Sequence, residues 1–197
     1  NGCEASDLVT IGEPTAITIT PTITDVTCNG GNDGAIEIVA MGGTAPYQYS
    51  IDGGMTFQPS GLFTGLVANS YNVVVMDDNG CDPSLTVVVN EPAPVVVTAT
   101  ATGVICYGDM NGEISASATG GAAPYQYSLD NMTWQLTGDF TGLAAGSYDV
   151  YVIDDNGCTG MTLVTVGTPD MITFGTDVSD IACNGGMDGM IEFVSVL

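Results

Sequence analysis

Apolar and polar residues alternate along short segments of this chain, and no segment repeats apolar residues at helical spacing. Ile36, Ile38 and Ala40 fall on one face of an expected strand, with Glu37 on the other. Such alternation is typical of strands that bury one face. Segments rich in glycine, asparagine and proline separate the alternating ones, as tight turns require. The pattern therefore predicts an all-β chain.

Seven short strands are expected within the first long stretch of alternation. The first runs from residue 17 to about residue 27 and is interrupted at Pro21, because proline cannot donate a ladder hydrogen bond. The others are expected near residues 36–40, 47–51, 56–58, 62–66, 71–76 and 85–89. Seven strands in about 77 residues predict an immunoglobulin-like or fibronectin-III-like β-sandwich.

The same pattern of residues returns after 77 to 78 positions. Ala45-Pro46-Tyr47-Gln48-Tyr49-Ser50 returns as residues 123–128, so that Pro124 repeats Pro46. Residues 63–66 return as 140–143, and residues 77–81 return as 154–158. A period of this length corresponds to a domain rather than to a solenoid repeat of 20 to 50 residues. The chain is therefore predicted to be a tandem array of sandwiches.

The repeat pattern divides the chain into four parts at proline-containing joints. We expect residues 1–14 to be the C-terminal part of a preceding repeat, and residues 15–92 and 93–169 to be complete repeats. Residues 170–197 then form the N-terminal part of a following repeat. The joints contain Pro14, Pro92, Pro94 and Pro169, and proline suits a short, stiff connection. These assignments predict that the sequence is one section of a longer array of repeats.

The charge of the chain narrows the range of functions that it can have. It contains 23 Asp plus Glu and no Lys, Arg or His, for a formal net charge of -23. Binding to nucleic acid needs cationic side chains, and an anionic membrane surface would repel this chain. No apolar run approaches the roughly 18 residues of a membrane span. Catalytic triads and histidine-based metal sites are excluded for lack of histidine, and we expect no enzyme activity.

Six cysteines recur at the repeat spacing and form two classes. One class lies in a glycine-rich turn (Cys28, Cys106 and Cys183), and the other follows an Asn-Gly hairpin tip (Cys3, Cys81 and Cys158). With no Cys-x-x-Cys pair, this pattern predicts disulfides and hence an oxidising location outside the cell.

Two disulfide pairings are open. Within a repeat, Cys28 would join Cys81, and Cys106 would join Cys158. In a seven-strand sandwich, however, these two turns lie at opposite ends, about 20 Å apart, and a disulfide needs Cα atoms within about 7 Å. The alternative joins successive repeats and pairs Cys28 with Cys158.

Further positions resemble known structural motifs. The spacing from Leu66 to Tyr71, repeated from Leu143 to Tyr148, looks like the tyrosine corner of immunoglobulin-like folds. Both tyrosines are expected to pack in the core. Trp134, which aligns with Phe57, could stack on a sugar but is more simply a sheet residue.

The order of motifs resembles the SprB repeat family. It comprises Cys-x-Gly followed by Asp-Gly, then Gly-Gly-x-x-Pro-Tyr-x-Tyr-Ser, then Gly-Leu-x4-Tyr-x-Val-x-Val-x-Asp-x-Asn-Gly-Cys and a closing proline, over residues 22–92 and 99–169. Asn111 departs from the pattern, since the other copies have Asp33 and Asp188 there. The resemblance implies repeats of very large cell-surface adhesins of Bacteroidetes, exported by the type IX route and used in gliding motility.

Acidic residues at the hairpin tips are the only candidates for ligand chemistry. Hard oxygen ligands at loop tips suit Ca²⁺, although their spacing matches no EF-hand and Asp-Asn-Gly is also an ordinary turn sequence. We therefore keep Ca²⁺ as a candidate ligand, with solvated anionic tips as the alternative. The candidate ligands are Asp33, Asp77, Asp78, Asn79, Asp154, Asp155 and Asn156.

These features favour an extracellular stalk or filament of a bacterial surface adhesin. One alternative is a structural module that assembles laterally into a sheath or surface layer, and another is a carbohydrate-binding repeat. The expected partners are neighbouring repeats of the same chain, with other filaments or surface polysaccharide as further candidates.

Overall fold

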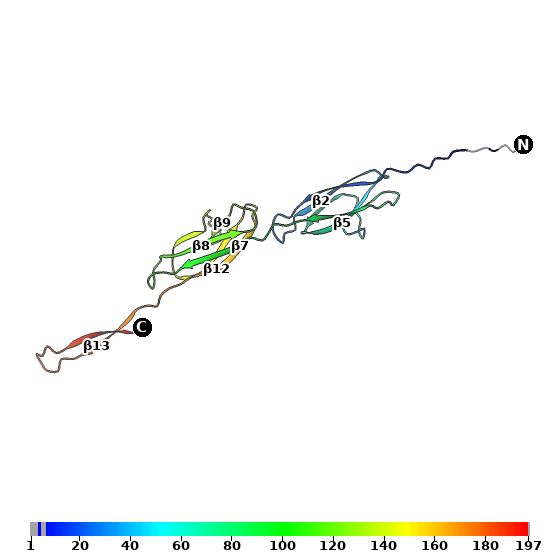
Figure 1. Cartoon of the computed structure of the whole chain (residues 1–197). Helices are drawn as coiled ribbons and strands as arrows, with labels where there is room; N and C mark the ends of the chain where they lie inside the picture. The colour runs from blue at the N-terminus through cyan, green and yellow to red at the C-terminus, as the bar shows by residue number, and fades with distance from the viewer. Residues whose placement is uncertain (1–3, 5–6, 197) are drawn as a thin grey trace. The chain divides into compact units, whose positions relative to one another are not determined.

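The computed structural model describes residue 4 and residues 7–196, and all their regular secondary structure is β-strand. The chain divides into two compact units, Asn1–Pro94 and Val95–Leu197, which we describe separately (Figure 1). In this described part of the chain, no helix is long and apolar enough to cross a membrane.

The first unit contains two three-stranded antiparallel sheets. One sheet has the order β1-β2-β4 and the other the order β3-β5-β6. These correspond to strands A-B-E and C-F-G of an immunoglobulin-like sandwich, so the predicted fold class is confirmed. The strands are β1 (Thr18–Thr24), β2 (Gly34–Met41), β3 (Gln48–Ser50), β4 (Leu62–Leu66), β5 (Asn69–Met76) and β6 (Ser84–Val89).

The core of the first repeat lies between these two sheets. Ile36 and Ile38 from β2 pack with Val73 and Val75 from β5, as the alternation of apolar residues predicts. Complete burial of such a side chain contributes about 1.5–3 kcal/mol. Valines of β6 and Val26 complete the buried cluster.

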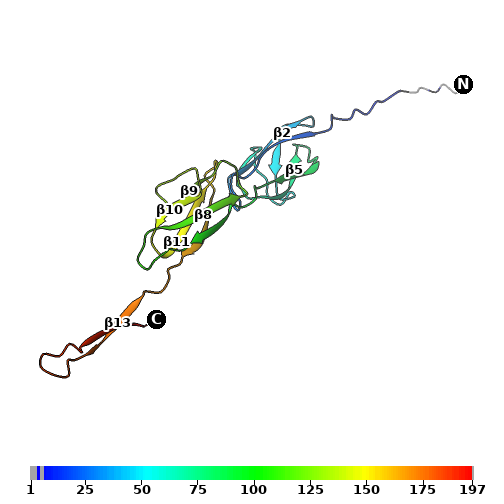
Figure 2. The ribbon, with the colours of Figure 1, turned by 60° about the vertical axis from the view of Figure 1, so that its left-hand side comes forward.

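The second unit repeats this arrangement, with sheets β7-β8-β10 and β9-β11-β12 (Figure 2). Its core combines Ile114 of β8 with Val150 and Val152 of β11. A further hairpin, β13 (Thr173–Ser179) with β14 (Met190–Val196), reproduces the pairing of the first two strands of a repeat. The strands of the second repeat are β7 (Val96–Thr102), β8 (Gly112–Thr119), β9 (Gln126–Ser128), β10 (Asp139–Leu143), β11 (Gly146–Ile153) and β12 (Thr159–Val166).

Two details of the predicted strands are wrong. The strand expected at residues 56–58 is only an isolated bridge between Tyr49 and Gln58, so each repeat has six strands rather than seven. The first strand also continues through Pro21, which lies opposite Ile38. Because β1 is at the edge of its sheet, the missing N–H of Pro21 can face away from β2.

Each sandwich has two distinct ends. We call the end that carries the Cys28 turn the turn end, and the end that carries the hairpin 77–81 the tip end. β2 runs from the turn end at Gly34 to the tip end at Met41. The segment after β2 contacts the hairpin tip, because the N–H of Asp78 donates to the Thr44 carbonyl at 2.9 Å.

Candidate functional site at the two ends of each repeat

Asp77 is a buried structural acceptor at the tip end, with a side chain only 5% exposed. Its Oδ1 accepts hydrogen bonds from the N–H groups of Asn79 at 3.0 Å and Cys81 at 2.9 Å. Its Oδ2 accepts one from the N–H of Thr44 at 2.9 Å. The N–H groups of Cys81 and Thr44 hold the pKa of Asp77 below its ordinary value.

Asp154 occupies the same position in the second repeat and is 4% exposed. It accepts from the N–H groups of Asn156 at 3.0 Å, Cys158 at 2.8 Å and Ala122 at 2.8 Å. Burial raises the pKa of Asp154, but these N–H donors together outweigh that effect and leave the pKa below its ordinary value. Both aspartates therefore fasten a hairpin tip to the body of its sandwich.

These hydrogen bonds bear on the calcium prediction. Both carboxylate oxygens of Asp77 and of Asp154 face backbone donors, whereas Asp78 and Asp155 are exposed. Asn79 donates from its side-chain amide to the Thr44 hydroxyl at 2.9 Å. Among the residues described, no three His, Cys, Asp or Glu side chains group as a metal site. Calcium binding at the hairpin tips stays a prediction, and it now rests on the exposed carboxylates Asp78 and Asp155.

At the turn end, Asp33 stabilises the cysteine-bearing turn. Its Oδ1 accepts from the N–H of Thr27 at 3.0 Å, and the Thr27 hydroxyl and N–H hold the pKa of Asp33 below its ordinary value. In the second repeat the amide oxygen of Asn111 accepts from Ile105 N–H, also at 3.0 Å. The position therefore needs a hydrogen-bond acceptor rather than a charge, which explains why the sequence can depart from aspartate there.

The cysteines differ in state. Cys28 and Cys158 are disulfide-bonded, whereas Cys81, Cys106 and Cys183 are free and exposed. Because Cys81 and Cys106 are free, neither pairing within a repeat is formed. Cys3 lies outside the described residues.

The tyrosines form the hydrogen bonds expected of a tyrosine corner. The hydroxyl of Tyr71 donates to the Val67 carbonyl at 2.9 Å, and that of Tyr148 to the Ala144 carbonyl at 2.9 Å. Leu66 and Leu143 pack against the two cores. Pro46 and Pro124 each follow a cis peptide bond.

One repeated acidic site escaped sequence interpretation. Asp52 accepts from the Ser50 hydroxyl at 2.7 Å and from the N–H of Thr56 at 3.0 Å. The hydroxyls of Thr56 and Ser50 hold the pKa of Asp52 well below its ordinary value. In the second repeat, the N–H groups of Thr133 and Met132 do the same for the pKa of Asp130. The Ser-x-Asp spacing shared by both copies could have indicated this turn.

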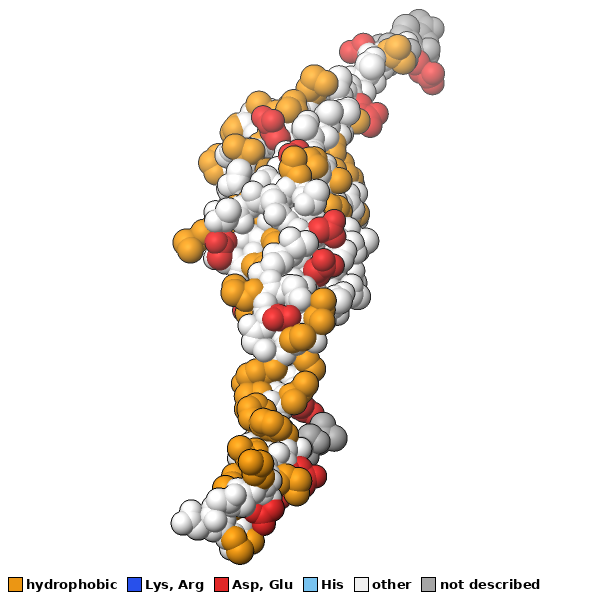
Figure 3. All heavy atoms as spheres, turned by 90° about the vertical axis from the view of Figure 1, so that its left-hand side faces the viewer, with side chains coloured by type: hydrophobic (Ala, Val, Ile, Leu, Met, Phe, Trp, Pro, Cys, Tyr) orange, Lys and Arg blue, Asp and Glu red, His pale blue; other side chains and the backbone are white. Residues whose placement is uncertain are grey.

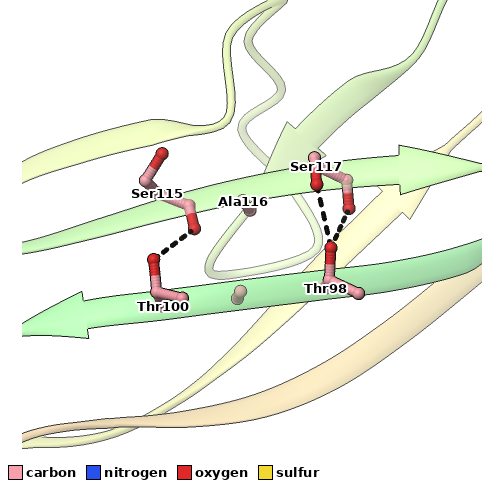
Figure 4. A pocket seen from close by; sticks show the side chains of 6 residues that line it. Thr98, Thr100, Ser115, Ala116 and Ser117 are labelled. Atoms are coloured by element: carbon pink, nitrogen blue, oxygen red, sulfur yellow. Dashed lines mark hydrogen bonds between the residues drawn. The ribbon is translucent and has the colours of Figure 1, made fainter.

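The second repeat has a small polar hollow on sheet β7-β8-β10, with a volume of about 200 Å³. The Thr98 hydroxyl lies 2.8 Å from that of Ser117, and the Thr100 hydroxyl donates to the Ser115 carbonyl (Figure 4). The first repeat has Val39 and Glu37 at the serine positions, so this hollow is not a shared property of the repeats. Trp134 and Phe57 are both partly buried, so neither is a fully exposed platform for a sugar.

Acidic side chains are the only charged ones on the face shown in Figure 3, where they lie among apolar and neutral residues. With no basic side chain in the sequence, these carboxylates can be balanced only by solvent cations or by a partner.

A family model described as the SprB repeat matches residues 20–56 and 98–133. The chain carries two SprB repeats. The matched segments include the turn cysteines Cys28 and Cys106 and end after β3 and β9, whereas the repeated motifs continue to Cys81 and Cys158. No curated protein matches the chain.

Several solved structures are similar to these tandem SprB repeats. A C-terminal fragment of intimin in complex with the translocated intimin receptor has a TM-score of 0.39 and 16% identity, over 83% of this chain and 67% of that one. Immunoglobulin domains 1–5 of Sidekick-1 give a TM-score of 0.38 and 14% identity over 86% and 42%. Domains 4–9 of the surface layer protein SbsC give a TM-score of 0.32 and 12% identity, over 94% of this chain and 36% of that one. The chain spans less than half the length of the latter two.

Proposed function

We propose that this chain is a section of an extracellular stalk in a bacterial surface adhesin, of the kind used in gliding motility. It separates an adhesive element from the cell surface and carries tension along a series of sandwiches. Its partners are the neighbouring repeats of the same chain. Repeats of the SprB family occur in cell-surface adhesins, and disulfide-bonded cysteines suit a location outside the cytoplasm.

The path of the chain through each repeat is the observation that supports this proposal. The chain enters the first sandwich at the tip end, where the N–H of Gly43 donates to the Thr15 carbonyl at 2.7 Å. It leaves at the turn end, where the side-chain amide of Asn29 donates to the Pro92 carbonyl at 3.1 Å. A domain entered and left at opposite ends can be joined in series without folding the array back on itself.

This path also sets how a repeat would carry load. β1 and β6 both run from the tip end toward the turn end, and each pairs along its length with a central strand, β2 or β5. Tension between the two ends therefore acts along the strands and must shear several ladder hydrogen bonds together. Uniform negative charge adds repulsion between neighbouring stalks at low ionic strength.

Sedimentation velocity of the purified chain, over a hundredfold range of concentration and with or without Ca²⁺, tests the stalk against lateral assembly. We expect a monomer throughout, whereas polymers that grow with concentration would favour a sheath or surface layer. Antibodies against the chain should label intact cells of its source organism. Labelling only after the cells are broken would overturn the proposed location.

A further inference from the structure

We propose that Asn156 is a deamidation site of the folded chain, and that the hydroxyl of Thr44 protects the equivalent Asn79 from the same reaction. The proposal concerns the hairpin tip of each repeat taken by itself. It does not depend on the proposed function, because the reaction needs no partner and no particular location.

Both hairpin tips contain the pair of residues in which deamidation is easiest. In an Asn-Gly pair, the glycine has no side chain to shield the backbone nitrogen that attacks the asparagine amide. The pair lies within the same five residues, Asp-Asp-Asn-Gly-Cys, at 77–81 and at 154–158. A Cβ added at Gly80 or at Gly157 would meet no atom within 4 Å. Local sequence and access to the attacking nitrogen are therefore equal at the two tips.

The backbone of the two tips is also held in the same way. The N–H of each glycine donates to the carbonyl of the first aspartate, at 3.0 Å in the first tip and at 3.1 Å in the second. The N–H of Asn79 and that of Asn156 donate to the carboxylate of the same aspartate, both at 3.0 Å. Both asparagines are exposed. These hydrogen bonds therefore give the two tips no difference in reactivity.

The side-chain amides of the two asparagines differ. Asn79 donates from its amide nitrogen to the Thr44 hydroxyl at 2.9 Å. Ala122 occupies the position of Thr44 in the second repeat and has no hydroxyl. Among the residues that the structure describes, the side-chain amide of Asn156 has no hydrogen-bond partner. It can therefore rotate toward the nitrogen of Gly157, whereas Asn79 must first break its bond to Thr44.

The reaction consumes only water, with hydroxide as the base. Hydroxide removes the proton from the Gly157 nitrogen, which then bonds to the side-chain carbonyl carbon (Cγ) of Asn156. The bond from Cγ to Nδ2 breaks, and Nδ2 takes a proton from water and leaves as ammonia. Water then opens the resulting succinimide ring at either of its carbonyls, which gives aspartate or isoaspartate. The net change replaces NH₂ by OH and adds a negative charge at neutral pH.

Formation of isoaspartate also loosens the tip that Asp154 holds. The N–H groups of Asn156 and Cys158 both donate to Oδ1 of Asp154, at 3.0 and 2.8 Å. In isoaspartate the main chain passes through the side-chain carbons, so an additional methylene separates these two donors and they no longer fit one oxygen. Asn156→Asp adds the charge without changing the main chain. The melting temperature should therefore fall further in the aged chain than in Asn156→Asp.

Peptide mapping of the aged chain tests the proposal. The purified chain is kept in mildly alkaline buffer at physiological temperature, and samples are reduced, alkylated and digested with chymotrypsin. Cleavage after tyrosine and leucine releases Asn79 in peptide 72–85 and Asn156 in peptide 152–163. Mass spectrometry then follows the gain in mass from replacing NH₂ by OH. We expect peptide 152–163 to convert roughly two- to tenfold faster, the rate factor that one net hydrogen bond provides.

Two substitutions exchange the environments of the asparagines. Thr44→Ala should bring Asn79 to the rate of Asn156, because it removes the hydroxyl but keeps the N–H that bonds the buried aspartate, as Ala122 does in the second repeat. Ala122→Thr should slow the reaction of Asn156, and a slower reaction does not result from a loss of stability.

The chain unfolded in urea is the control for local sequence. The two tips should react at similar rates there, because residues 77–81 and 154–158 are identical. A difference that persists in urea would mean that sequence rather than Thr44 sets the rates. Equal rates at the two tips of the folded chain would also overturn the proposal, as would an Asn79 rate that Thr44→Ala leaves unchanged.

Discussion

The Asp154 carboxylate accepts a 2.8 Å hydrogen bond from the N–H of Ala122, which lies 32 positions earlier in the chain. Asp77 accepts the equivalent bond from Thr44 at 2.9 Å. Each bond joins a hairpin tip to the segment that follows the central strand of the opposite sheet. The two sheets of a repeat are therefore connected at the tip end by a buried carboxylate as well as by their shared apolar core.

We predict that Asp154→Asn destabilises the second repeat. Asparagine has only one acceptor oxygen, so its NH₂ group would face one of the three N–H donors that now bond the carboxylate. An unpaired buried donor is costly, and we expect the melting temperature to fall by about 4–8 °C or more. Thermal melts followed by circular dichroism measure this. Asp155→Asn at the exposed neighbour is the control, and equal melting temperatures for the two variants would contradict the structural role of Asp154.

At the turn end we predict the opposite outcome for the same chemical change. Asp33→Asn should leave stability nearly unchanged, because Asn111 already provides the equivalent acceptor in the second repeat. Exposed substitutions of this kind usually change stability by less than about 0.5 kcal/mol. Asp33→Ala, which removes the acceptor for Thr27, should be measurably less stable than Asp33→Asn in urea titrations. If the Asn and Ala variants lose equal stability, charge rather than hydrogen bonding is what the position requires.

Acid should destabilise the repeats by protonating a defined set of carboxylates. The native pKa values of Asp33, Asp52, Asp77, Asp130 and Asp154 all lie below the ordinary value of 3.8. A lowered native pKa contributes stability that is complete above the unfolded pKa and is lost as pH falls toward the native one.

We therefore expect the melting temperature to be constant between about pH 5 and 8, where the chain has no histidine to titrate, and to fall below about pH 4. The melts should be recorded in high salt, because neutralising the other carboxylates also relieves repulsion at low ionic strength. A melting temperature that stays constant down to pH 2 would mean that these carboxylates contribute no net stability.

The limits of sequence interpretation are visible in these same residues. The core positions Ile36, Val73 and Val75 follow from alternation, because a half-buried strand imposes a period of two. The tip sequence Asp77-Asp78 repeats as an acidic cluster, but its two carboxylates have different roles, since Asp77 is buried and Asp78 is exposed. The difference arises from Thr44, whose N–H donates to the Asp77 carboxylate. That contact depends on how the two sheets pack. Sequence periodicity does not report such a contact between distant segments.

Salt should stabilise the chain, because 23 acidic side chains repel one another without any basic residue to offset them. We expect the melting temperature to rise with NaCl concentration. Melting temperatures in CaCl₂ should be compared with those in NaCl at the same ionic strength, and a chelator should then be added to remove Ca²⁺. This comparison separates charge screening from calcium binding. A further rise that Asp78→Asn and Asp155→Asn abolish would support calcium at the exposed tip residues. An equal rise in melting temperature with both salts would mean that charge screening alone stabilises the chain.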